Sequence, residues 1–577
     1  IGYAYKSIDD KDNNASGKVE QLSSVIDYLI DVANEQNIKV KQLWLDKIPG
    51  LIFVEDLAKK YNYKSTAGVI NPIIGEYDDP ANQRQELLTL NLTKDGNTIV
   101  YGSSGSGKNT FINSVVYSTI INHTAEEVNF YIMDFGSEIF RTYKKAPQVG
   151  DVLMVNDVEK VNNLFKMLFE KIAERKKILS NYNGDFSYYN KKNEKKMPLI
   201  VVIINNYEAF YENYSIHEEH MLSLTREGSM YGIVFILSVS STNSIRYRLK
   251  QNFKQEYVLQ LNDESDYSSV LGNIHKMYPS KIYGRGLVKL DNIYEFQTSY
   301  PYEPEKLSEH ILEICEKLKD ESNVFAEPVA ILPDIVTSDY INSKLTGLNS
   351  IPLGVNKNTL SISTWDFMNN NSTIITASEF ENMNFFIKPF IEQFRKLNNT
   401  NILVFDAINM LKEIENKDNI FCYHNDYDKV ILSLNDIIQK QKDVFIKNNY
   451  NKDIFNNTKS VVCIIIGLDN LMMKLNQTVK DEYNSLIETS NMIGTIKFIF
   501  IDSIDIFKKM EYDNWYKAII KNNQGIWIGN GISEQYTLKI TKITRELQQE
   551  VENGFGYIVK RGTPVLTKFL TSEEGYE

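Results

Sequence analysis

The chain has 577 residues and a formal net charge of −12, with 42% hydrophobic and 24% charged residues. This length exceeds the size at which a single core stops growing, so we expect two or more domains, and the composition excludes a disordered chain. The acidic balance argues against a surface that neutralises nucleic acid phosphates. The sequence contains no run of 18 apolar residues that would predict a membrane-spanning helix.

The cysteines and histidines predict neither a disulfide framework nor a zinc centre. Cys315, Cys422 and Cys463 are widely separated and odd in number, which is typical of a protein from a reducing, cytosolic compartment. His217 and His220 lie in HEEH without a cysteine or carboxylate cluster at zinc spacing. We interpret that segment as an exposed helical turn.

Residues 1–43 have the pattern of a linker that leads in from an upstream domain. A polar start, DDKDNNASGK, precedes apolar residues at helical spacing. The first compact unit is expected to begin near Trp44. The apolar positions of the predicted helix are Leu22, Val25, Ile26, Leu29 and Val32.

Residues 44–318 alternate short apolar runs with helical patterns, which predicts an α/β domain. The runs are rich in β-branched residues and nearly continuous, as in strands that a parallel sheet buries on both faces. They are TIVYG (98–102), NFYIMDFG (129–136), LIVVIINN (199–206), GIVFILSVSS (232–241) and EYVLQL (256–261).

Residues 319–577 repeat this design after a connector that contains EPVAILPDIVT. PIIGEYDDP of the first half matches IPLGVNKN of the second, and LIVVIINN matches VVCIIIGL, which indicates an internal duplication. The predicted fold class is therefore α/β, with two tandem modules around mostly parallel central sheets. The second series of runs is STIITAS (372–378), NILVFDA (401–407), SVVCIIIGLDN (460–470), TIKFIFID (495–502) and GIWIGN (525–530).

A phosphate-binding loop, GSSGSGKNT, overlaps the end of the first apolar run. Such a loop needs a preceding strand, glycines that let backbone N–H groups wrap the phosphates, a following helix and a lysine, and all four are present. We therefore expect ATP here, the alternative being a Gly/Ser turn that merely joins strand to helix. The candidate nucleotide-binding residues are Gly102, Ser103, Ser104, Gly105, Ser106, Gly107, Lys108, Asn109 and Thr110.

The magnesium ligand of this loop is altered. The residue after the lysine is normally Ser or Thr, whose hydroxyl binds Mg²⁺, and here it is Asn109. Asn109 offers only a neutral amide oxygen on a longer arm, and Thr110 points about 100° further round the helix. We expect Asn109 to be a poor ligand for Mg²⁺.

The run MPLIVVIINNYEAF has the form of a Walker B strand without its acids. Asn205 stands where an aspartate is expected and Asn206 where a catalytic acid usually follows, and neutral amides cannot act as a general base. Glu208 is the nearest acid and is expected past the strand end. Either these changes impair hydrolysis, or the asparagines simply cap the helix that follows.

The second half has lost the loop. Alignment of STIITASEFENMNFF on NTIVYGSSGSGKNTF places Ala377 opposite Gly102, Asn382 opposite Gly107 and Met383 opposite Lys108. The same comparison places Gly467 opposite Asn205. Without lysine and glycines there is no anion cradle, and we expect Phe380 and Met383 to form an exposed apolar contact surface, whereas Phe385 and Phe386 could enter the core.

Together these motifs resemble the FtsK/SpoIIIE family of ATPases, in particular its type VII secretion branch. The resemblance rests on WL(x)₃PG from residue 44, the loop GSSGSGKNT, the strand with NYEAF, and YGIVFILSVSSTNSIRYRLKQNF. It implies two RecA-like P-loop NTPase modules, of which residues 44–318 keep the loop and residues 319–577 form the degenerate copy.

The resemblance also implies a cellular setting. Members are membrane-anchored motors that couple tandem ATPase modules to export, so the chain would be a cytosolic C-terminal part at the cytoplasmic face of the cell membrane. The implied partners are secreted WXG100-type proteins, other components of the secretion system, and further copies of the full-length protein, as in a hexamer. An enzyme-dead scaffold that recognises substrates is the alternative, and the acidic balance disfavours a DNA translocase.

Three arginines are candidates for an arginine finger that reaches a neighbouring module's phosphates. They are Arg226 in TREGSMYGI, and Arg246 and Arg248 in RYRLKQNF. Solvated helix-face charges or structural ion pairs are the alternative for each of them.

Overall fold

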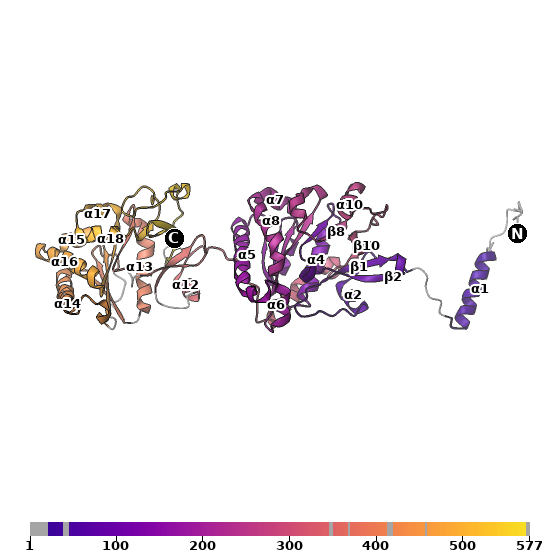
Figure 1. Ribbon diagram of the computed structural model, residues 1–577, viewed down its shortest axis with the longest axis horizontal. Coiled ribbons are helices and arrows are strands. Elements are labelled where there is room, and N and C mark those ends of the chain that lie inside the picture. Colours follow the sequence, from indigo (N-terminus) through magenta and orange to yellow (C-terminus); the bar gives the residue numbers. More distant parts are fainter. Residues whose placement is uncertain are drawn as a thin grey trace. The chain divides into compact units, whose positions relative to one another are not determined.

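The computed structural model describes residues 21–38, 45–344, 350–366, 370–397, 399–411, 419–455 and 458–572. The chain divides into two compact units, Ile1–Val329 (unit 1) and Ala330–Glu577 (unit 2) (Figure 1). The domain limits expected from the sequence stay a prediction, and Trp44 lies outside the described residues. Within the described ranges, no helix is both long enough and apolar enough to cross a membrane.

Unit 1 is built on a ten-stranded sheet in the order β2-β1-β10-β9-β8-β3-β7-β6-β4-β5. The strands from β8 to β5 pair in parallel, and β2, β1, β10 and β9 extend the sheet by antiparallel pairing. The strands are β1 (Ile73–Asp79), β2 (Arg84–Thr89), β3 (Thr98–Tyr101), β4 (Val128–Asp134), β5 (Val149–Leu153), β6 (Leu199–Asn205), β7 (Ile233–Val239), β8 (Gln255–Leu259), β9 (Arg285–Lys289) and β10 (Ile293–Thr298).

The parallel strands are buried on both faces, as their continuous apolar runs predict; every residue of β4, β6 and β7 is buried. One core lies between the sheet and α4 with α11, and the other between the sheet and α5, α7 and α8. The helices of unit 1 are α1 (Gln21–Glu35), α2 (Val54–Lys60), α3 (Leu92–Asp95), α4 (Lys108–Ile120), α5 (Val158–Leu179), α6 (Phe186–Lys192), α7 (Tyr207–Tyr214), α8 (Glu218–Glu227), α9 (Tyr247–Lys250), α10 (Glu264–Leu271) and α11 (Leu307–Glu321).

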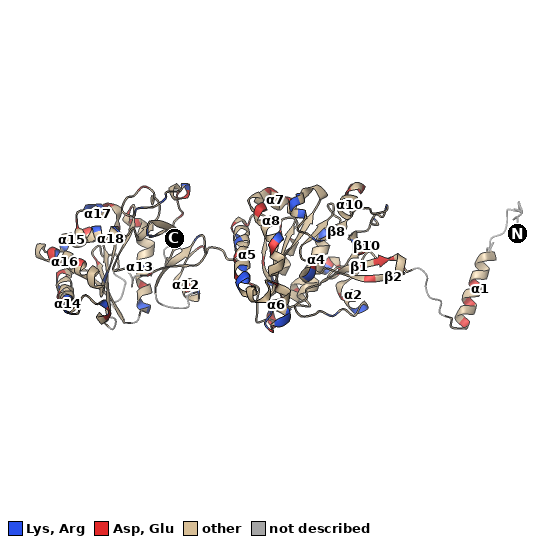
Figure 2. Ribbon diagram, in the orientation of Figure 1, with Lys and Arg blue, Asp and Glu red and all other residues tan. Residues whose placement is uncertain are grey.

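The charged side chains of unit 1 are of both signs. Figure 2 shows acidic residues along β1 and β2 and basic residues on α5 and α6. The predicted helix near the start of the chain forms as α1, and it has no buried residue.

Unit 2 has the same design, with a ten-stranded sheet in the order β12-β11-β20-β19-β18-β13-β17-β16-β14-β15. Each strand occupies the position of its counterpart in unit 1, and both the parallel and the antiparallel pairs recur. The strands are β11 (Ile351–Asn356), β12 (Ile362–Trp365), β13 (Ser372–Ala377), β14 (Thr400–Asp406), β15 (Ile420–Tyr423), β16 (Ser460–Ile466), β17 (Ile496–Ser503), β18 (Gly525–Ile528), β19 (Phe555–Lys560) and β20 (Thr563–Phe569).

The helices of unit 2 pack on both faces of this sheet, with separate cores that contain α13 on one face and α14 with α16 on the other. The predicted α/β fold with two tandem, mostly parallel sheets is confirmed. The helices are α12 (Ser338–Lys344), α13 (Asn384–Gln393), α14 (Tyr427–Lys447), α15 (Leu468–Lys474), α16 (Gln477–Ile493), α17 (Ile504–Lys509) and α18 (Asn514–Ile520).

The register of the two sheets corrects one sequence alignment. Asp134 pairs with Asn205 in unit 1, and Asp406 pairs with Ile466 in unit 2. The counterpart of Gly467 is therefore Asn206 and not Asn205. Backbone conformation agrees, because Gly467 (φ 78°) and Asn206 (φ 71°) are both left-handed residues that precede a helix.

The degenerate loop of unit 2 also differs from expectation. Residues Phe380–Met383 form a 3₁₀ turn before α13, and this turn directs Met383 into the core, where the residue is 0% exposed. Phe380 is partly buried against the same core. The predicted exposed cluster of Phe380 and Met383 is therefore wrong, most clearly for Met383, because the turn that replaces the phosphate loop packs inward.

Met383→Asp is expected to destabilise unit 2 by about 4 kcal/mol or more, because it buries an unpaired carboxylate. Denaturant unfolding followed by tryptophan fluorescence measures this, since Trp365, Trp515 and Trp527 all lie in unit 2. Met383→Leu is the control and should cost less than about 1.5 kcal/mol. Equal unfolding midpoints for the aspartate and leucine variants would show that Met383 is not in the core.

Candidate nucleotide-binding site

The loop between β3 and α4 lies at the carboxyl end of the parallel strands. β3 ends at Tyr101 and α4 begins at Lys108. Gly107 has a φ of 109°, and a Cβ there would lie 2.8 Å from the Gly284 Cα. Gly105 also has a positive φ, of 74°. Both positions favour glycine because their φ angles are positive. At Gly107, the nearby backbone of Gly284 also leaves no room for a Cβ.

Neighbouring strands hold this loop in place. Gly102 N–H donates to the Val239 carbonyl (3.0 Å), and Ser103 N–H donates to the Gln260 carbonyl (2.7 Å). On the other side, Gly284 N–H donates to the Ser106 carbonyl (3.0 Å). The loop is therefore fixed by the ends of β7 and β8 and by the segment that enters β9.

The start of α4 presents donors to the space above the loop. The first N–H groups of any helix have no intrahelical acceptor, and the helix dipole makes this end attractive to anions. The side chain of Ser106 is buried, and its hydroxyl has no hydrogen-bond partner among the described residues. A glycine-rich loop that leads into the first turn of a helix has the shape and the N–H donors to bind a chain of phosphates.

Lys108 supplies the positive charge of this site. Its ammonium donates to the carbonyls of Gly102 and Ser103, the latter at 3.0 Å. Burial lowers the pKa of Lys108, and the negative charge of Glu208 partly offsets that effect. A half-buried ammonium gains from an anionic ligand.

The two residues after Lys108 point in different directions. The Asn109 side chain donates to the Ser137 hydroxyl (3.0 Å), whereas the Thr110 hydroxyl donates to Tyr283 (3.2 Å) and is buried. The hydroxyl of Thr110 thus makes its contact away from Asn109. Only a neutral amide stands at the position of the usual magnesium ligand.

Asn205 is engaged in a buried hydrogen-bond chain at the end of β6. Its amide nitrogen donates to Asp134 Oδ1 (2.9 Å), and its amide oxygen accepts from the Ser238 hydroxyl (2.8 Å). The residue is 3% exposed. It therefore joins β6 to the neighbouring strands β4 and β7, with both amide atoms in use.

Asn206 has a different role from Asn205, because it caps a helix. Its side-chain oxygen accepts from the Ala209 N–H (3.2 Å) and caps α7, and its own N–H donates to Ser238 (2.8 Å). Helix capping, which the sequence left open as an alternative, is what Asn206 does here. A cap needs no acid, which accounts for an amide at this position.

Glu208 lies closer to the loop than the sequence suggests. It follows the strand end as expected, but it belongs to the first turn of α7, and its Oε1 accepts from the Ser240 N–H (2.6 Å). Its Oε2 is buried with no hydrogen-bond partner among the described residues. Glu208 is thus a carboxylate in the electrostatic range of Lys108, and only the fold of α7 over the end of β7 reveals this.

The three candidate arginines are exposed and paired with glutamates. Arg246 contacts Glu218 at 2.7 Å and lies over the Tyr211 ring, while Arg248 and Arg226 contact Glu219 (3.9 Å) and Glu227 (3.3 Å). Arg226 is in the last turn of α8, before β7 begins. It therefore lies at the amino ends of the parallel strands, whereas the loop lies at their carboxyl ends. An arginine finger from any of them stays a prediction.

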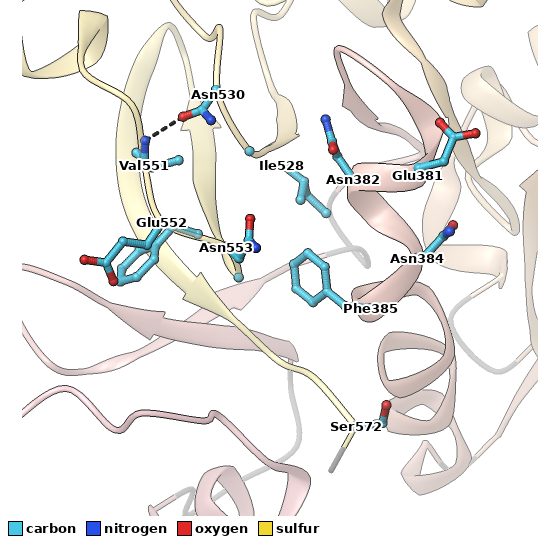
Figure 3. A pocket seen from close by; sticks show the side chains of 13 residues that line it. Glu381, Asn382, Asn384, Phe385, Ile528, Asn530, Val551, Glu552, Asn553 and Ser572 are labelled. Carbon is cyan, nitrogen blue, oxygen red and sulfur yellow. Dashed lines mark hydrogen bonds between the residues drawn. The ribbon is translucent and has the colours of Figure 1, made fainter. Parts of the chain in front are cut away.

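Unit 2 has a cavity where unit 1 has its loop. Ala377 ends β13 and Asn382, the counterpart of Gly107, hydrogen-bonds to Ser378 (3.2 Å). Gly554, which precedes β19 as Gly284 precedes β9, lines a cavity of about 710 Å³ together with Asn382 and Phe385 (Figure 3). This cavity lies between the turn at Phe380–Met383 and the residues that precede β19. The charged side chains of its lining, Glu381 and Glu552, are acidic. This cavity does not suit phosphates.

Comparison with known proteins extends this description. Residues 75–275 match the FtsK/SpoIIIE family. The type VII secretion system protein EssC of Staphylococcus aureus (strain MRSA252) is 24% identical over 556 residues, which cover 92% of this chain and 36% of that protein. The chain therefore spans about a third of the length of this relative.

Solved structures show the same fold. ATPases 2 and 3 of EssC from Geobacillus thermodenitrificans superpose with a TM-score of 0.77 at 22% identity, over 92% of this chain and all of that one. ATPases 2 and 3 of Thermomonospora curvata EccC, solved in complex with a signal sequence peptide, give a TM-score of 0.51 at 18% identity, over 89% and 95% of the chains. Residues 75–275 are thus similar to the FtsK/SpoIIIE family, and the relatives that the chain resembles along most of its length include EssC and EccC proteins of type VII secretion systems.

Proposed function

We propose that unit 1 binds ATP at residues 102–110 and that the chain is the nucleotide-binding part of a type VII secretion ATPase. The observation that carries this proposal is the half-buried Lys108 on a glycine turn at the start of α4. ATP phosphates would lie against the loop N–H groups and the Lys108 ammonium. The family match supports this assignment.

Magnesium is held less well than in a complete P-loop site. Asn109 offers one neutral oxygen, and both amide atoms of Asn205 are already hydrogen-bonded. Asp134 and Glu208 are the carboxylates at these strand ends that could attract the ion or polarise water. Bound Mg²⁺ would neutralise phosphate charge, so we propose that unit 1 binds ATP firmly and hydrolyses it slowly.

Unit 2 is proposed to recognise protein rather than nucleotide. The cavity beside Phe385 and Gly554 has acidic and amide groups with an aromatic wall, and a peptide is a better match for it than a phosphate chain. The Thermomonospora neighbour was solved with a signal sequence peptide, which supports export substrates of WXG100 type as the ligands. This second role would remain if unit 1 bound no nucleotide.

The parent protein is proposed to act at the cytoplasmic face of the cell membrane. There it would associate with other secretion-system components and with further copies of itself. The relationship to the much longer EssC supports this setting.

Lys108→Ala is expected to weaken ATP binding by about 10- to 100-fold, which corresponds to the loss of charge-assisted hydrogen bonds of about 1.5–3 kcal/mol. Isothermal titration of the full chain with ATP measures this. Lys94→Ala is the matched control, because Lys94 is exposed before β3 starts and lies at the other end of that strand. Absence of ATP binding by the unmodified chain would refute the proposal.

Asn205→Asp is expected to lower the stability of unit 1 by about 2 kcal/mol without Mg²⁺, because it places a second carboxylate beside Asp134. One carboxyl of such a pair has a raised pKa, so the cost is present above that pKa and disappears as the pH falls. Mg²⁺ with ATP should restore the melting temperature.

The double variant Asn109→Ser/Asn205→Asp is expected to raise Mg²⁺-dependent phosphate release above that of the unmodified chain. Asn213→Asp, a similar change on the exposed part of α7, is the control for charge alone. If the double variant binds ATP but turns it over no faster, the missing component is a group from another module and not the metal ligand.

A further inference from the structure

A thiol, an imidazole and a carboxylate meet at the edge of the sheet of unit 2. Cys422 is on the edge strand β15, His424 follows that strand, and Asp406 ends the neighbouring strand β14. Residues two apart share one face of a strand, and Cys422 pairs with Val404, two residues before Asp406. The ligand atoms of the three side chains lie within 4.8 Å of one another.

The distances suit a metal ion of zinc type. Cys422 Sγ lies 3.7 Å from His424 Nε2, and a tetrahedral zinc with bonds of about 2.3 Å to sulfur and about 2.0 Å to nitrogen would separate these atoms by about 3.5 Å. Asp406 Oδ2 lies 3.2 Å from the other ring nitrogen, His424 Nδ1, and an ion shared by the three side chains would use only one ring nitrogen, which lies within 4.8 Å of both the sulfur and a carboxylate oxygen. His424 Nδ1 is buried with no hydrogen-bond partner among the described residues.

Asp406 keeps capacity for an ion. It is 0% exposed, and its oxygens accept from the N–H groups of Met410 (3.1 Å) and Leu411 (2.8 Å). A carboxylate has about four lone-pair positions, so each oxygen retains one after these two bonds. The turn after β14 thus fixes the carboxylate without saturating it.

Because the fold is duplicated, the same positions can be compared between the two units. The counterparts of Cys422 and His424 in unit 1 are Val152 and Met154, by the matching registers of β4 with β5 and β14 with β15. Both unit 1 residues are buried in an apolar core. Unit 2 therefore has a thiol and an imidazole where unit 1 has core side chains, next to the strand-end aspartate that both units share. Cys422 packs in the core of unit 2 as Val152 does in unit 1, whereas His424 places a polar ring where unit 1 has Met154.

We propose that Cys422, His424 and Asp406 bind a divalent cation of zinc type, with water as the fourth ligand. Thiolate and imidazole favour zinc over Mg²⁺ or Ca²⁺, which prefer oxygen alone. Burial raises the pKa of the Cys422 thiol to about 11, so binding forms a sulfur–metal bond and releases the thiol proton to solvent. The ion would join the edge strand β15 to β14.

The sequence alone predicted no zinc site. Asp406 and Cys422 are 16 residues apart in the sequence, and CxH is shorter than the usual zinc spacing. Only the parallel pairing of β14 and β15 brings the three side chains together. The site is in unit 2, so the proposal does not depend on nucleotide binding by unit 1.

Cobalt substitution tests the proposal on the full chain without an affinity tag. After chelator treatment and dialysis, one equivalent of Co²⁺ is expected to give thiolate-to-cobalt charge-transfer absorption in the near ultraviolet, and Zn²⁺ should abolish that absorption. Zn²⁺ should also raise the melting temperature of unit 2 by a few degrees, because it binds the folded state.

Cys422→Val/His424→Met is the decisive variant, because it installs the pair that unit 1 carries at the same positions. It should fold with a normal circular dichroism spectrum and lose both the cobalt absorption and the thermal shift. His220→Gln is the control. His220 lies beside His217, with the Nδ1 atoms of the two rings 2.9 Å apart, and His217 is buried and not exposed as the sequence suggested.

The control variant is expected to bind one equivalent of Co²⁺ with the same absorption as the unmodified chain. Two results would overturn the proposal. One is an unmodified chain that takes up Co²⁺ without thiolate absorption or not at all. The other is a folded Cys422→Val/His424→Met variant that still binds one equivalent with that absorption.

Discussion

The contact between Gly107 and Gly284 fixes the position of the loop at residues 102–110. A Cβ on Gly107 would meet the Gly284 backbone at 2.8–2.9 Å, and Gly284 in turn donates to the Ser106 carbonyl and accepts from the Thr298 N–H. The antiparallel strands β9 and β10 therefore support a loop that the parallel strand β3 delivers. With the loop held there, Lys108 and the start of α4 face the same space, so the proposed anion site depends on this approach of two backbones.

Unit 2 shows what happens when that contact is lost. Asn382 stands in place of Gly107, and it cannot approach Gly554 as glycine approaches Gly284. The turn instead packs Met383 into the core and leaves a cavity between Asn382, Phe385 and Gly554 (Figure 3). One duplicated sheet thus carries a phosphate loop in unit 1 and a hollow in unit 2, and the same strand-end aspartate lies beside Asn205 in one unit and beside His424 in the other. The fold is common to both units, and their chemistry differs at the strand ends.

Much of the fold follows from the sequence, because buried parallel strands leave continuous apolar runs such as LIVVIIN of β6. The loop follows too, since its glycines and lysine have fixed spacing. The antiparallel strands β9 and β10 were not among the predicted strands. The alignment of Gly467 with Asn205 was wrong by one residue. Only the strand register shows that the counterpart of Gly467 is Asn206, which is also a left-handed residue. Glu208 and the Asp406, Cys422 and His424 cluster depend on side chains that meet across strands, which no local pattern records.

Hydrogen exchange with and without ATP tests the central claim most directly, because it reports on individual backbone segments of the full chain. The account predicts that ATP slows exchange at residues 103–110, where loop N–H groups and the start of α4 would donate to phosphates. Residues 377–385 of unit 2, which lack the anion cradle, should exchange at the same rate in both conditions. Equal rates at residues 103–110 with saturating ATP, or protection confined to residues 377–385, would contradict the account.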